Sequence, residues 1–419
     1  MMERVVVIGG GVGGCAAALA ARKAGCQVEI IERMDSVSGL APWTGQLLTW
    51  MVRQEAKLLG GGAADIIDLM ESLAIHIMPE FDVPDGRVTF DVTRIEEGMR
   101  KLVEGAGIKV RYHSRVVDVE MEGPKMVAAL LEGGTKIKGD AFVDATGRTG
   151  GVEWCEKLGQ GCVQCMLKCT VFGDRVSIAA KAGVPDLEEN WNYFPMPYIT
   201  LESLSSEVRS KIEGTEGGYS YHPIPGELLE RDFTNDWHRS DRPVTTRIKG
   251  KIPGMLEVIH VPFAKCTLNL PLRWWRQITG FENAWLVQPL SAEGETVGTG
   301  FCAQREETMQ VKGLANLFAG GLRSGRYSAF VEVMLTGDLA GHNAARQVLG
   351  RDLVTYPNST LIGYFVNVLK SGRTPTDWGG PMLDDPRFKE QGLATTDYRK
   401  IRYRMENAGM INAFAKRLS

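Results

Sequence analysis

A glycine-rich turn between two short apolar strands, close to the N-terminus, limits the fold of this chain more than any other feature. Residues 4–8 (RVVVI) form a β-branched run typical of a buried parallel strand, and residues 9–14 (GGGVGG) follow directly. Gly9, Gly11 and Gly14 occupy the three glycine positions of a G-x-G-x-x-G pattern. Such glycines allow a tight turn, close approach of the backbone to a pyrophosphate, and close packing of the next helix.

The elements after the glycines complete a β-α-β unit. An alanine-rich helix is expected from about Gly13 to Gly25, and residues 27–32 (QVEIIE) form a second strand that ends in an acid. Glu32 lies about 20 residues past the glycines, where a carboxylate meets ribose hydroxyls. Because strand, glycines, helix, strand and acid occur in order, the segment predicts a dinucleotide-binding unit with the helix N-terminus facing the phosphates.

Two later stretches indicate which dinucleotide is bound. Residues 115–120 are a strand candidate, a hairpin with residues 132–134 (EGG) as its turn follows, and residues 141–147 (AFVDATG) end in small residues. A strand end of this kind lets the backbone approach a cofactor without an intervening side chain. Farther along, residues 316–321 (NLFAGG) lead through a glycine turn to a helix that contains residues 330–341.

This order of segments resembles the flavoproteins of the glutathione-reductase-like superfamily. The resemblance implies FAD as the cofactor and an adenine contact from the backbone of Val117. It also implies that the helix after the third strand points its N-terminus at the flavin, where the dipole stabilises negative charge on the reduced ring. Fingerprint and resemblance together predict these cofactor-binding residues: Gly9, Gly11, Gly13, Gly14, Glu32, Arg33, Gly39, Val117, Ala145, Thr146, Gly147, Gly320, Gly321, Phe330 and Val331.

The third segment narrows the resemblance to one group of flavoproteins. Residues 317–320 (LFAG), 330–332 (FVE) and 337–345 (GDLAGHNAA) look like GidA-related flavoproteins. That group includes the glucose-inhibited division protein and a folate- and FAD-dependent tRNA uridine methyltransferase, and residues 356–363 (YPNSTLIG) are similar to a stretch of the methyltransferase. The catalytic cysteine of the methyltransferases has no counterpart in residues 38–45 (SGLAPWTG). The resemblance therefore implies the fold and FAD, and RNA uridine modification with FAD and a folate as an alternative activity.

Four of the eight cysteines lie in one short stretch: Cys155, Cys162, Cys165 and Cys169. Their C-x2-C-x3-C spacing resembles part of a ferredoxin-type ligand run, so all four are candidate ligands of an iron–sulfur cluster. Cys162 and Cys165 also form a C-x-x-C pair, which could act as a catalytic dithiol that exchanges electrons with a flavin. An inert apolar helix face or a zinc site would give a similar pattern.

The composition is that of a globular cytoplasmic protein that does not enter a membrane. Hydrophobic residues make up 44% of the 419, charged residues 24%, and the N-terminal apolar run that imitates a signal peptide carries the fixed glycines of the fingerprint. A net charge of −3 leaves no global basic excess for a polyanion. RNA would need a local patch of arginines interleaved with aromatic residues, such as residues 239–251, 273–276 or 399–417.

The sequence therefore predicts an α/β fold with a discontinuous Rossmann-type FAD-binding domain, a mixed α+β second domain and a helical C-terminal tail. The boundaries are residues 1–37, 88–150 and 284–350 for the FAD-binding domain, 38–87 for a helical insert, 151–283 for the second domain with the substrate and the cysteines, and 351–419 for the tail.

The predicted activity is two-electron oxidation–reduction at FAD, with the cysteines as an electron entry or exit point. The expected partners are a small-molecule substrate or a redox partner protein, and a second copy of the chain. A flavin-bound redox sensor without turnover is a further alternative. No second complete G-x-G-x-x-G unit occurs, so a separate nicotinamide-binding domain is not expected.

Overall fold

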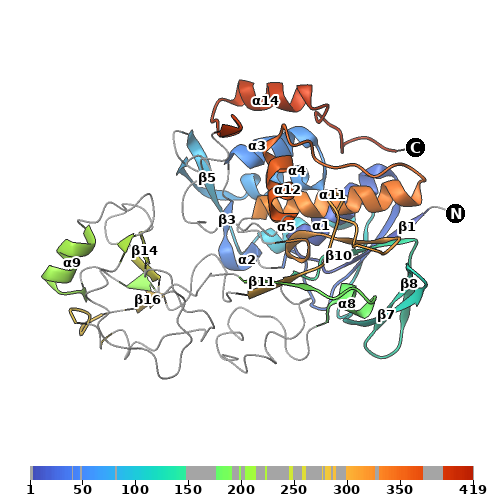
Figure 1. Ribbon diagram of the computed structural model, residues 1–419, viewed down its shortest axis with the longest axis horizontal. Helices are drawn as coiled ribbons and strands as arrows, with labels where there is room; N and C mark the ends of the chain where they lie inside the picture. The colour runs from blue at the N-terminus through green and yellow to red at the C-terminus, as the bar shows by residue number, and fades with distance from the viewer. Residues whose placement is uncertain are drawn as a thin grey trace.

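The structure is a computed structural model. The part of the chain that it describes is built around a parallel sheet covered by helices (Figure 1). It describes residues 3–147 apart from 40, 48–49 and 81–82, then 176–190, short elements between 198 and 288, and residues 299–325, 330–370 and 390–418. The parallel sheet with covering helices is the predicted α/β class.

The central sheet has five parallel strands in the order β18-β10-β1-β2-β6. The strands are β1 (Arg4–Ile8), β2 (Gln27–Ile31), β6 (Lys109–Arg111), β10 (Ala141–Asp144) and β18 (Leu317–Ala319). Val5, Val6 and Val7 are completely buried, as expected for the middle strand of a parallel sheet that is covered on both faces. Three stretches of chain that are far apart in the sequence therefore meet in one sheet.

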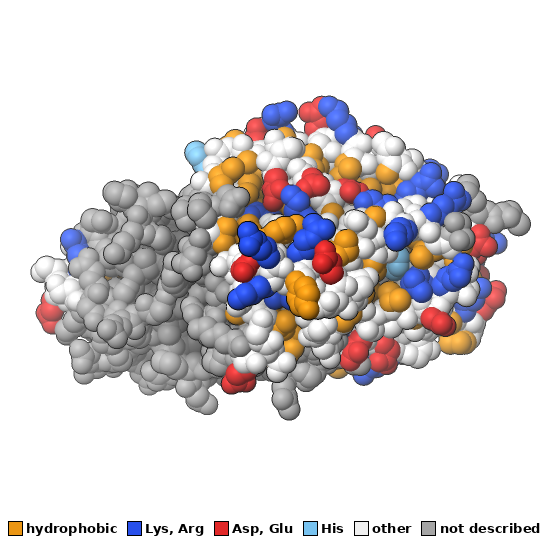
Figure 2. All heavy atoms as spheres, turned by 90° about the horizontal axis from the view of Figure 1, so that it is seen from above, with side chains coloured by type: hydrophobic (Ala, Val, Ile, Leu, Met, Phe, Trp, Pro, Cys, Tyr) orange, Lys and Arg blue, Asp and Glu red, His pale blue; other side chains and the backbone are white. Residues whose placement is uncertain are grey.

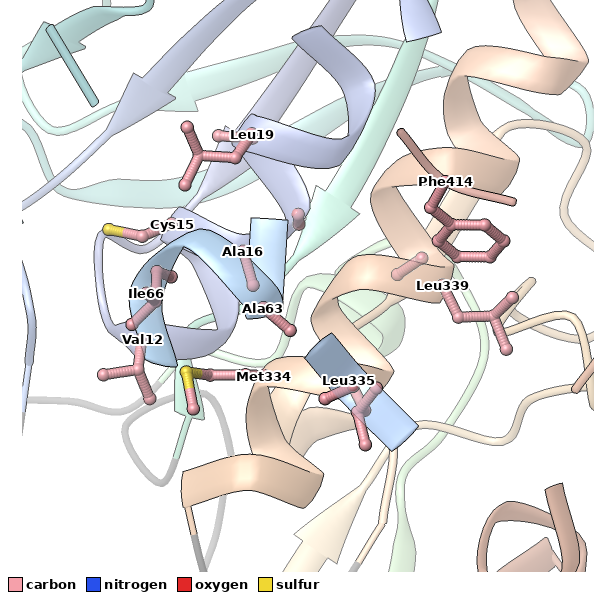
Figure 3. Close-up of a cluster of buried hydrophobic side chains, with 14 of the residues drawn as sticks. Val12, Cys15, Ala16, Leu19, Ala63, Ile66, Met334, Leu335, Leu339 and Phe414 are labelled. Carbon is pink, nitrogen blue, oxygen red and sulfur yellow. The ribbon is translucent and has the colours of Figure 1, made fainter. Parts of the chain in front are cut away.

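Two helices that cross at their glycines cover one side of this sheet. They are α1 (Val12–Ala24) and α11 (Phe330–Val348). A Cβ atom on Gly337 would overlap the carbonyl oxygen of Gly13, and one on Gly341 would overlap that of Ala17. The two backbones thus touch directly, which only glycine permits. Helix α4 (Gly62–Ser72) packs against the same pair, and Figure 3 shows side chains of all three helices filling the space between them.

The segment from 38 to 87, predicted as a helical insert, is not purely helical. It contains α2 (Ala41–Thr44), α3 (Trp50–Leu59) and α4, together with strands β3 (Gln46–Leu47), β4 (Ala74–Glu80) and β5 (Val83–Phe90). The strands form an antiparallel sheet in the order β3-β5-β4. In β5, Gly86, Val88 and Phe90 are buried while Arg87 and Thr89 are half-buried, a period of two that marks a strand and carries it past the predicted boundary at residue 87.

Smaller elements surround the central layers. They are α5 (Ile95–Gly105), the antiparallel sheet of β7 (Val116–Glu122), β8 (Lys125–Leu131) and β9 (Lys136–Lys138), then α8 (Ile178–Lys181), β11 (Leu187–Asn190) and β17 (Thr299–Cys302). A second five-stranded sheet contains β12 (Tyr198–Ile199), β13 (His222–Pro223), β14 (Thr245–Ile248), β15 (Glu257–His260) and β16 (Leu286–Gln288), and α9 (Ser206–Glu213) precedes β13.

The C-terminal part of the chain returns to the N-terminal helices. Its helices are α12 (Leu361–Lys370) and α14 (Tyr398–Asn407), and both contact α3. Beyond α14, the ring of Phe414 stacks on that of His342 in α11, with 3.9 Å between the ring centroids. Among the helices in the described ranges, none combines the length and apolarity needed to cross a bilayer.

Candidate cofactor site

The fingerprint turn is held in place by contacts between backbones. Gly9 has a φ of 104°, in the left-handed region, and a Cβ atom there would lie 2.5 Å from the carbonyl oxygen of Ala145. A Cβ atom on Gly14 would overlap the carbonyl oxygen of Gly9. Any residue other than glycine at these two positions would therefore separate β1 from α1 or from the end of β10.

The N-terminus of α1 is open in the way that an anion site requires. Its N-cap residue Gly11 is extended and makes no side-chain capping hydrogen bond, and the first turn of the helix contains no acid. The described atom nearest to a Cβ placed on Gly11 is the Cα of Gly39, 3.9 Å away, so the described residues leave room beside Gly11. Uncapped backbone N–H groups at the positive end of a helix dipole favour a phosphate at this point.

The carboxylate of Glu32 closes the other side of the turn. One of its oxygens accepts a hydrogen bond from the Gly10 N–H at 2.6 Å, and the other accepts one from the Met34 N–H at 2.7 Å. Only 9% of Glu32 is exposed, at the end of β2. Two backbone donors thus fix the carboxylate, and its remaining lone pairs are available to a ribose hydroxyl.

The second segment ends in a turn that Asp144 organises. The last residue of β10 is Asp144, completely buried, and its Oδ1 accepts hydrogen bonds from the Thr146 N–H (3.2 Å) and the Thr146 hydroxyl (2.6 Å). The Ala145 N–H donates to the carbonyl of Ile8 in β1 at 2.9 Å. Gly147 has a φ of 64°, and an added Cβ would meet no atom within 4 Å. No described residue therefore covers the backbone of this turn at Gly147.

The third segment reaches the same place from β18. The Gly320 N–H donates to the carbonyl of Asp144 at 2.9 Å, and a Cβ on Gly13 would lie 3.1 Å from the Cα of Gly321. The Gly321 N–H donates to the Thr336 hydroxyl of α11 at 3.1 Å. The three segments thus meet through their backbones at the ends of β1, β10 and β18.

The other predicted cofactor residues lie around this meeting point. Val331 is completely buried in the first turn of α11, and Phe330 beside it is half-buried. Arg33 follows Glu32 and is half-buried, whereas Val117 is half-buried in β7, outside the central sheet. The structure brings the fingerprint glycines together with Gly39, Ala145 to Gly147 and Gly320 to Gly321, and leaves Val117 and Arg33 on flanking elements.

The four clustered cysteines, Cys155, Cys162, Cys165 and Cys169, lie outside the described residues. Within the described ranges, no group of three or more His, Cys, Asp or Glu side chains is arranged to hold a metal ion. Cys15, on the fingerprint helix, is completely buried and donates to the Gly10 carbonyl at 3.3 Å, and burial raises the pKa of its thiol to about 12. Such a thiol is a packing group and not a nucleophile.

One charged group beneath the site was not predicted from the sequence. Arg323 is completely buried, and its Nε lies 3.0 Å from Asp144 Oδ2. The only signal in the sequence is that an acid ends the apolar run of β10 and an arginine follows the glycines of the third segment. Their separation of 179 residues gives no indication that they meet.

Comparison with known proteins gives the class. A family model described as FAD dependent oxidoreductase matches residues 4–152, which contain the fingerprint turn and the turn at residues 145–147. A second family model, described as Glucose inhibited division protein A, matches residues 264–352. The chain is therefore similar to FAD-dependent oxidoreductases over its first two segments and to the glucose inhibited division protein A family over its third.

Individual relatives are distant. GidA from Aquifex aeolicus shares the fold with a TM-score of 0.56 at 18% identity, over 97% of this chain and 76% of that chain. The aromatic hydroxylase CabE from angucycline biosynthesis has a TM-score of 0.50 at 14% identity, over 98% of this chain and 76% of that chain. A chloroplastic zeaxanthin epoxidase of Oryza sativa subsp. japonica is 32% identical over 164 residues, which is 34% of this chain and only 25% of the epoxidase.

The groups at the cradle fit an FAD cofactor. An added Cβ on Gly11 or on Gly147 would meet no described atom closer than 3.9 Å, and uncapped amides and the fixed carboxylate of Glu32 lie at the same turn as Gly11. These groups match the pyrophosphate and a ribose of a dinucleotide.

Proposed function

We propose that this chain carries out two-electron oxidation–reduction with FAD held in the cradle between the fingerprint turn, residues 145–147 and residues 320–321. The observation that carries the proposal is the open N-terminus of α1, where Gly11 leaves room for a phosphate. FAD supplies the ring that accepts and donates the two electrons. The protein supplies the backbone donors for the phosphates and the Glu32 carboxylate for a ribose.

The first test of this function is the substitution Gly11→Asp. The new side chain enters open space, so the fold should persist, but its negative charge would lie where a phosphate belongs. We expect the purified wild-type chain to show flavin absorption and to release FAD on denaturation. Gly11→Asp should bind FAD at least about tenfold more weakly. Gly105→Asp, at the exposed end of α5 where an added Cβ meets nothing, is the control and should bind as the wild type does.

A small-molecule substrate or a redox partner protein is the proposed source or acceptor of the electrons. Reduction of the bound flavin, followed by absorbance without oxygen, tests each donor in turn. Catalytic turnover with any donor would exclude a redox sensor without turnover. If no candidate donor reduces the flavin and no candidate acceptor reoxidises it, the result would instead favour the redox sensor.

The clustered cysteines are the proposed electron entry or exit point, supported by their spacing in the sequence. Iron and acid-labile sulfide analysis of protein purified without oxygen separates the two chemistries. Iron and sulfide at cluster stoichiometry would assign Cys155, Cys162, Cys165 and Cys169 as ligands. The dithiol would be assigned if the protein contains no iron and if oxidation removes two titratable thiols from the wild type but none from Cys162→Ser. If neither of these two results is obtained, the cysteines are not part of the electron path.

RNA uridine modification with FAD and a folate is the second candidate, and the match of residues 264–352 to the GidA model favours it. Arg399, Lys400, Arg402 and Tyr403 are exposed on α14 and could contact a phosphate backbone. On the face of the molecule that carries α14, however, basic side chains lie among acidic ones (Figure 2). Retention of RNA that weakens steeply with salt, and weakens further in Arg399→Ala, would support this activity. Salt-independent or absent retention would contradict it.

A further inference from the structure

A single buried arginine joins two of the three cofactor segments. The guanidinium of Arg323 lies between two acids, with Nε 3.0 Å from Asp144 Oδ2 and Nη2 2.6 Å from Asp186 Oδ1. Nη2 also donates to the hydroxyl of Ser177 at 2.9 Å. The side chain of Arg323 is 0% exposed, and those of Asp144 and Asp186 are 0% and 7% exposed. This group of four residues is called the Arg323 network below.

The charges in the Arg323 network require one another. Burial alone would lower the pKa of Arg323, but attraction by Asp144 and Asp186 outweighs burial and raises it above its ordinary value. Burial raises the pKa of Asp186, and the guanidinium opposes that rise. A buried charge that loses its partner is strongly destabilised, so the guanidinium of Arg323 and the carboxyl groups of Asp144 and Asp186 hold each other in one geometry.

Asp144 passes this geometry on to the cofactor-facing turns. Its Oδ2 is taken by Arg323, while its Oδ1 accepts from both the N–H and the hydroxyl of Thr146. Its backbone carbonyl accepts from the N–H of Gly320, which directly precedes the 3-10 turn Gly321–Arg323. The carboxylate is thus fixed from one side by Arg323 and fixes Thr146 on the other.

The network also reaches the first described residues after the second segment. The Ser177 hydroxyl caps α8 by accepting from the Ala180 N–H at 3.1 Å, and it donates to Asp186 at 2.9 Å. Asp186 directly precedes β11, whose Leu187 pairs with Cys302 of β17. Ala303, which follows Cys302, donates its N–H to the Arg323 carbonyl at 2.8 Å. Residues 177–187 are therefore anchored to the same guanidinium that holds Asp144.

We propose that Arg323 is a positioning residue for FAD: through Asp144 it sets the turn at Thr146 and the turn at Gly320 to Gly321 in their cofactor-binding arrangement. Asp186 and Ser177 hold the far side of the guanidinium. The proposal rests on the binding of FAD by this chain. It differs from a purely structural ion pair because it places the effect of the arginine on the cofactor and not only on the stability of the fold.

The test uses four variants and three measurements. The variants are Arg323→Gln, Arg323→Lys, Asp186→Asn and, as a matched control, Arg53→Gln. Arg53 is another buried arginine; it donates to the Gly86 carbonyl at 2.9 Å and lies 3.4 Å from Glu71, two residues that belong to none of the three cofactor segments. The measurements are the FAD dissociation constant of the apoprotein, the visible circular dichroism of the bound flavin, and the melting temperature of the apoprotein.

Arg323→Gln is expected to raise the dissociation constant about tenfold or more and to change the visible circular dichroism. Arg323→Lys keeps the charge but not the two-sided fork, so it should restore binding in part. Asp186→Asn leaves the Asp144–Arg323 pair intact and should change the constant by less than about threefold. Arg53→Gln should lower the melting temperature and leave both flavin measurements unchanged.

Wild-type binding and circular dichroism in Arg323→Gln would overturn the proposal, whatever its melting temperature. An equal loss of FAD affinity in Arg53→Gln would also overturn it, because general destabilisation would then explain the effect. If Arg323→Gln does not fold, Arg323→Lys decides: unchanged circular dichroism refutes the positioning role. A wild-type chain that binds no FAD would contradict the proposed function itself, which is a separate outcome.

Discussion

At the scale of single residues, α11 carries two buried titratable groups one turn apart. Asp338 is completely buried, and its Oδ1 accepts from the Gly62 N–H at the start of α4 at 2.7 Å. Burial raises its pKa to about 7, and the Gly62 and Ala63 amides oppose that rise. His342 is 1% exposed beneath Phe414, and burial lowers its pKa to about 3. Both side chains are therefore most stable in the folded protein when they are uncharged.

The two groups give opposite pH dependences. The folded pKa of Asp338 lies above that of an unfolded aspartate. Its contribution to the free energy of unfolding is therefore fully present below about pH 4 and is lost as the pH rises to about 7. The folded pKa of His342 lies below its ordinary value of 6.5. Its contribution to the free energy of unfolding is therefore present above that pH and is lost as the pH falls toward 3. A single stability curve of the wild type would mix these two trends.

Asp338→Asn separates them. The amide keeps an oxygen for the Gly62 N–H but cannot ionise, so only the dependence due to Asp338 disappears. We expect the free energy of unfolding of the wild type, relative to Asp338→Asn, to fall by about 2–4 kcal/mol between pH 4 and pH 7. Urea unfolding of both proteins across this range measures the difference. A constant difference would show that Asp338 is ionised at all of these pH values.

At the scale of elements, the contact between α1 and α11 depends on small residues at fixed intervals. Gly337 and Gly341 of α11 face Gly13 and Ala17 of α1, and each pair is four residues apart. Gly341→Ala would drive a methyl group into the Ala17 carbonyl, so the helices must separate. We expect a loss of about 1–3 kcal/mol in the free energy of unfolding and weaker FAD binding, because α11 also holds Gly321 through Thr336.

Gly105→Ala is the control for this prediction. Gly105 ends α5, is exposed, and an added Cβ meets nothing within 4 Å. There the change should be neutral or stabilise by up to about 1 kcal/mol, since alanine favours a helix more than glycine does. Denaturant unfolding and FAD titration on the two variants check both parts. Equal stability of Gly341→Ala and the wild type would show that the helices can move apart without cost.

The same elements show what the sequence can and cannot predict. The fingerprint, its helix and the strands at residues 141 and 317 were predictable, because backbones that touch require glycine or other small residues at fixed positions. The sequence does not predict the sheet of the insert, because β5 contains Pro84, Asp85 and Gly86, which are uncommon in strands, and its alternation covers only a few residues. The Arg323 network was missed because its ion pairs join residues 137 and 179 positions apart, and no local pattern encodes such a pairing.

At the scale of the whole molecule, one buried carboxylate fastens the C-terminal tail to the N-terminal half. Glu55 of α3 is 0% exposed and accepts from the Leu361 and Ile362 amides at the start of α12, at 3.1 and 2.9 Å. Arg404 of α14 completes the cluster, with its Nε 2.5 Å from Glu55 Oε1. Figure 1 shows α14 lying above α3, which α12 also contacts, so this cluster lies where the first and last parts of the chain meet.

Removing Arg404 alone should therefore cost more than removing the whole ion pair. Arg404→Met leaves the Glu55 carboxylate buried with backbone donors only, and we expect a loss of about 3–5 kcal/mol in the free energy of unfolding. In Glu55→Gln/Arg404→Met the amide oxygen still accepts from one of the two α12 amides and no charge remains, so part of that loss should be recovered. Arg402→Met is the control: its pair with Glu406 is exposed, and its loss should cost less than about 1 kcal/mol.

Urea unfolding measures the stability of all three variants. Limited proteolysis should cut the tail of Arg404→Met first, because α14 loses its anchor. If the double variant were less stable than Arg404→Met, the Glu55 carboxylate would be stabilising the tail through its amide contacts alone, and the ion pair would not be the anchor.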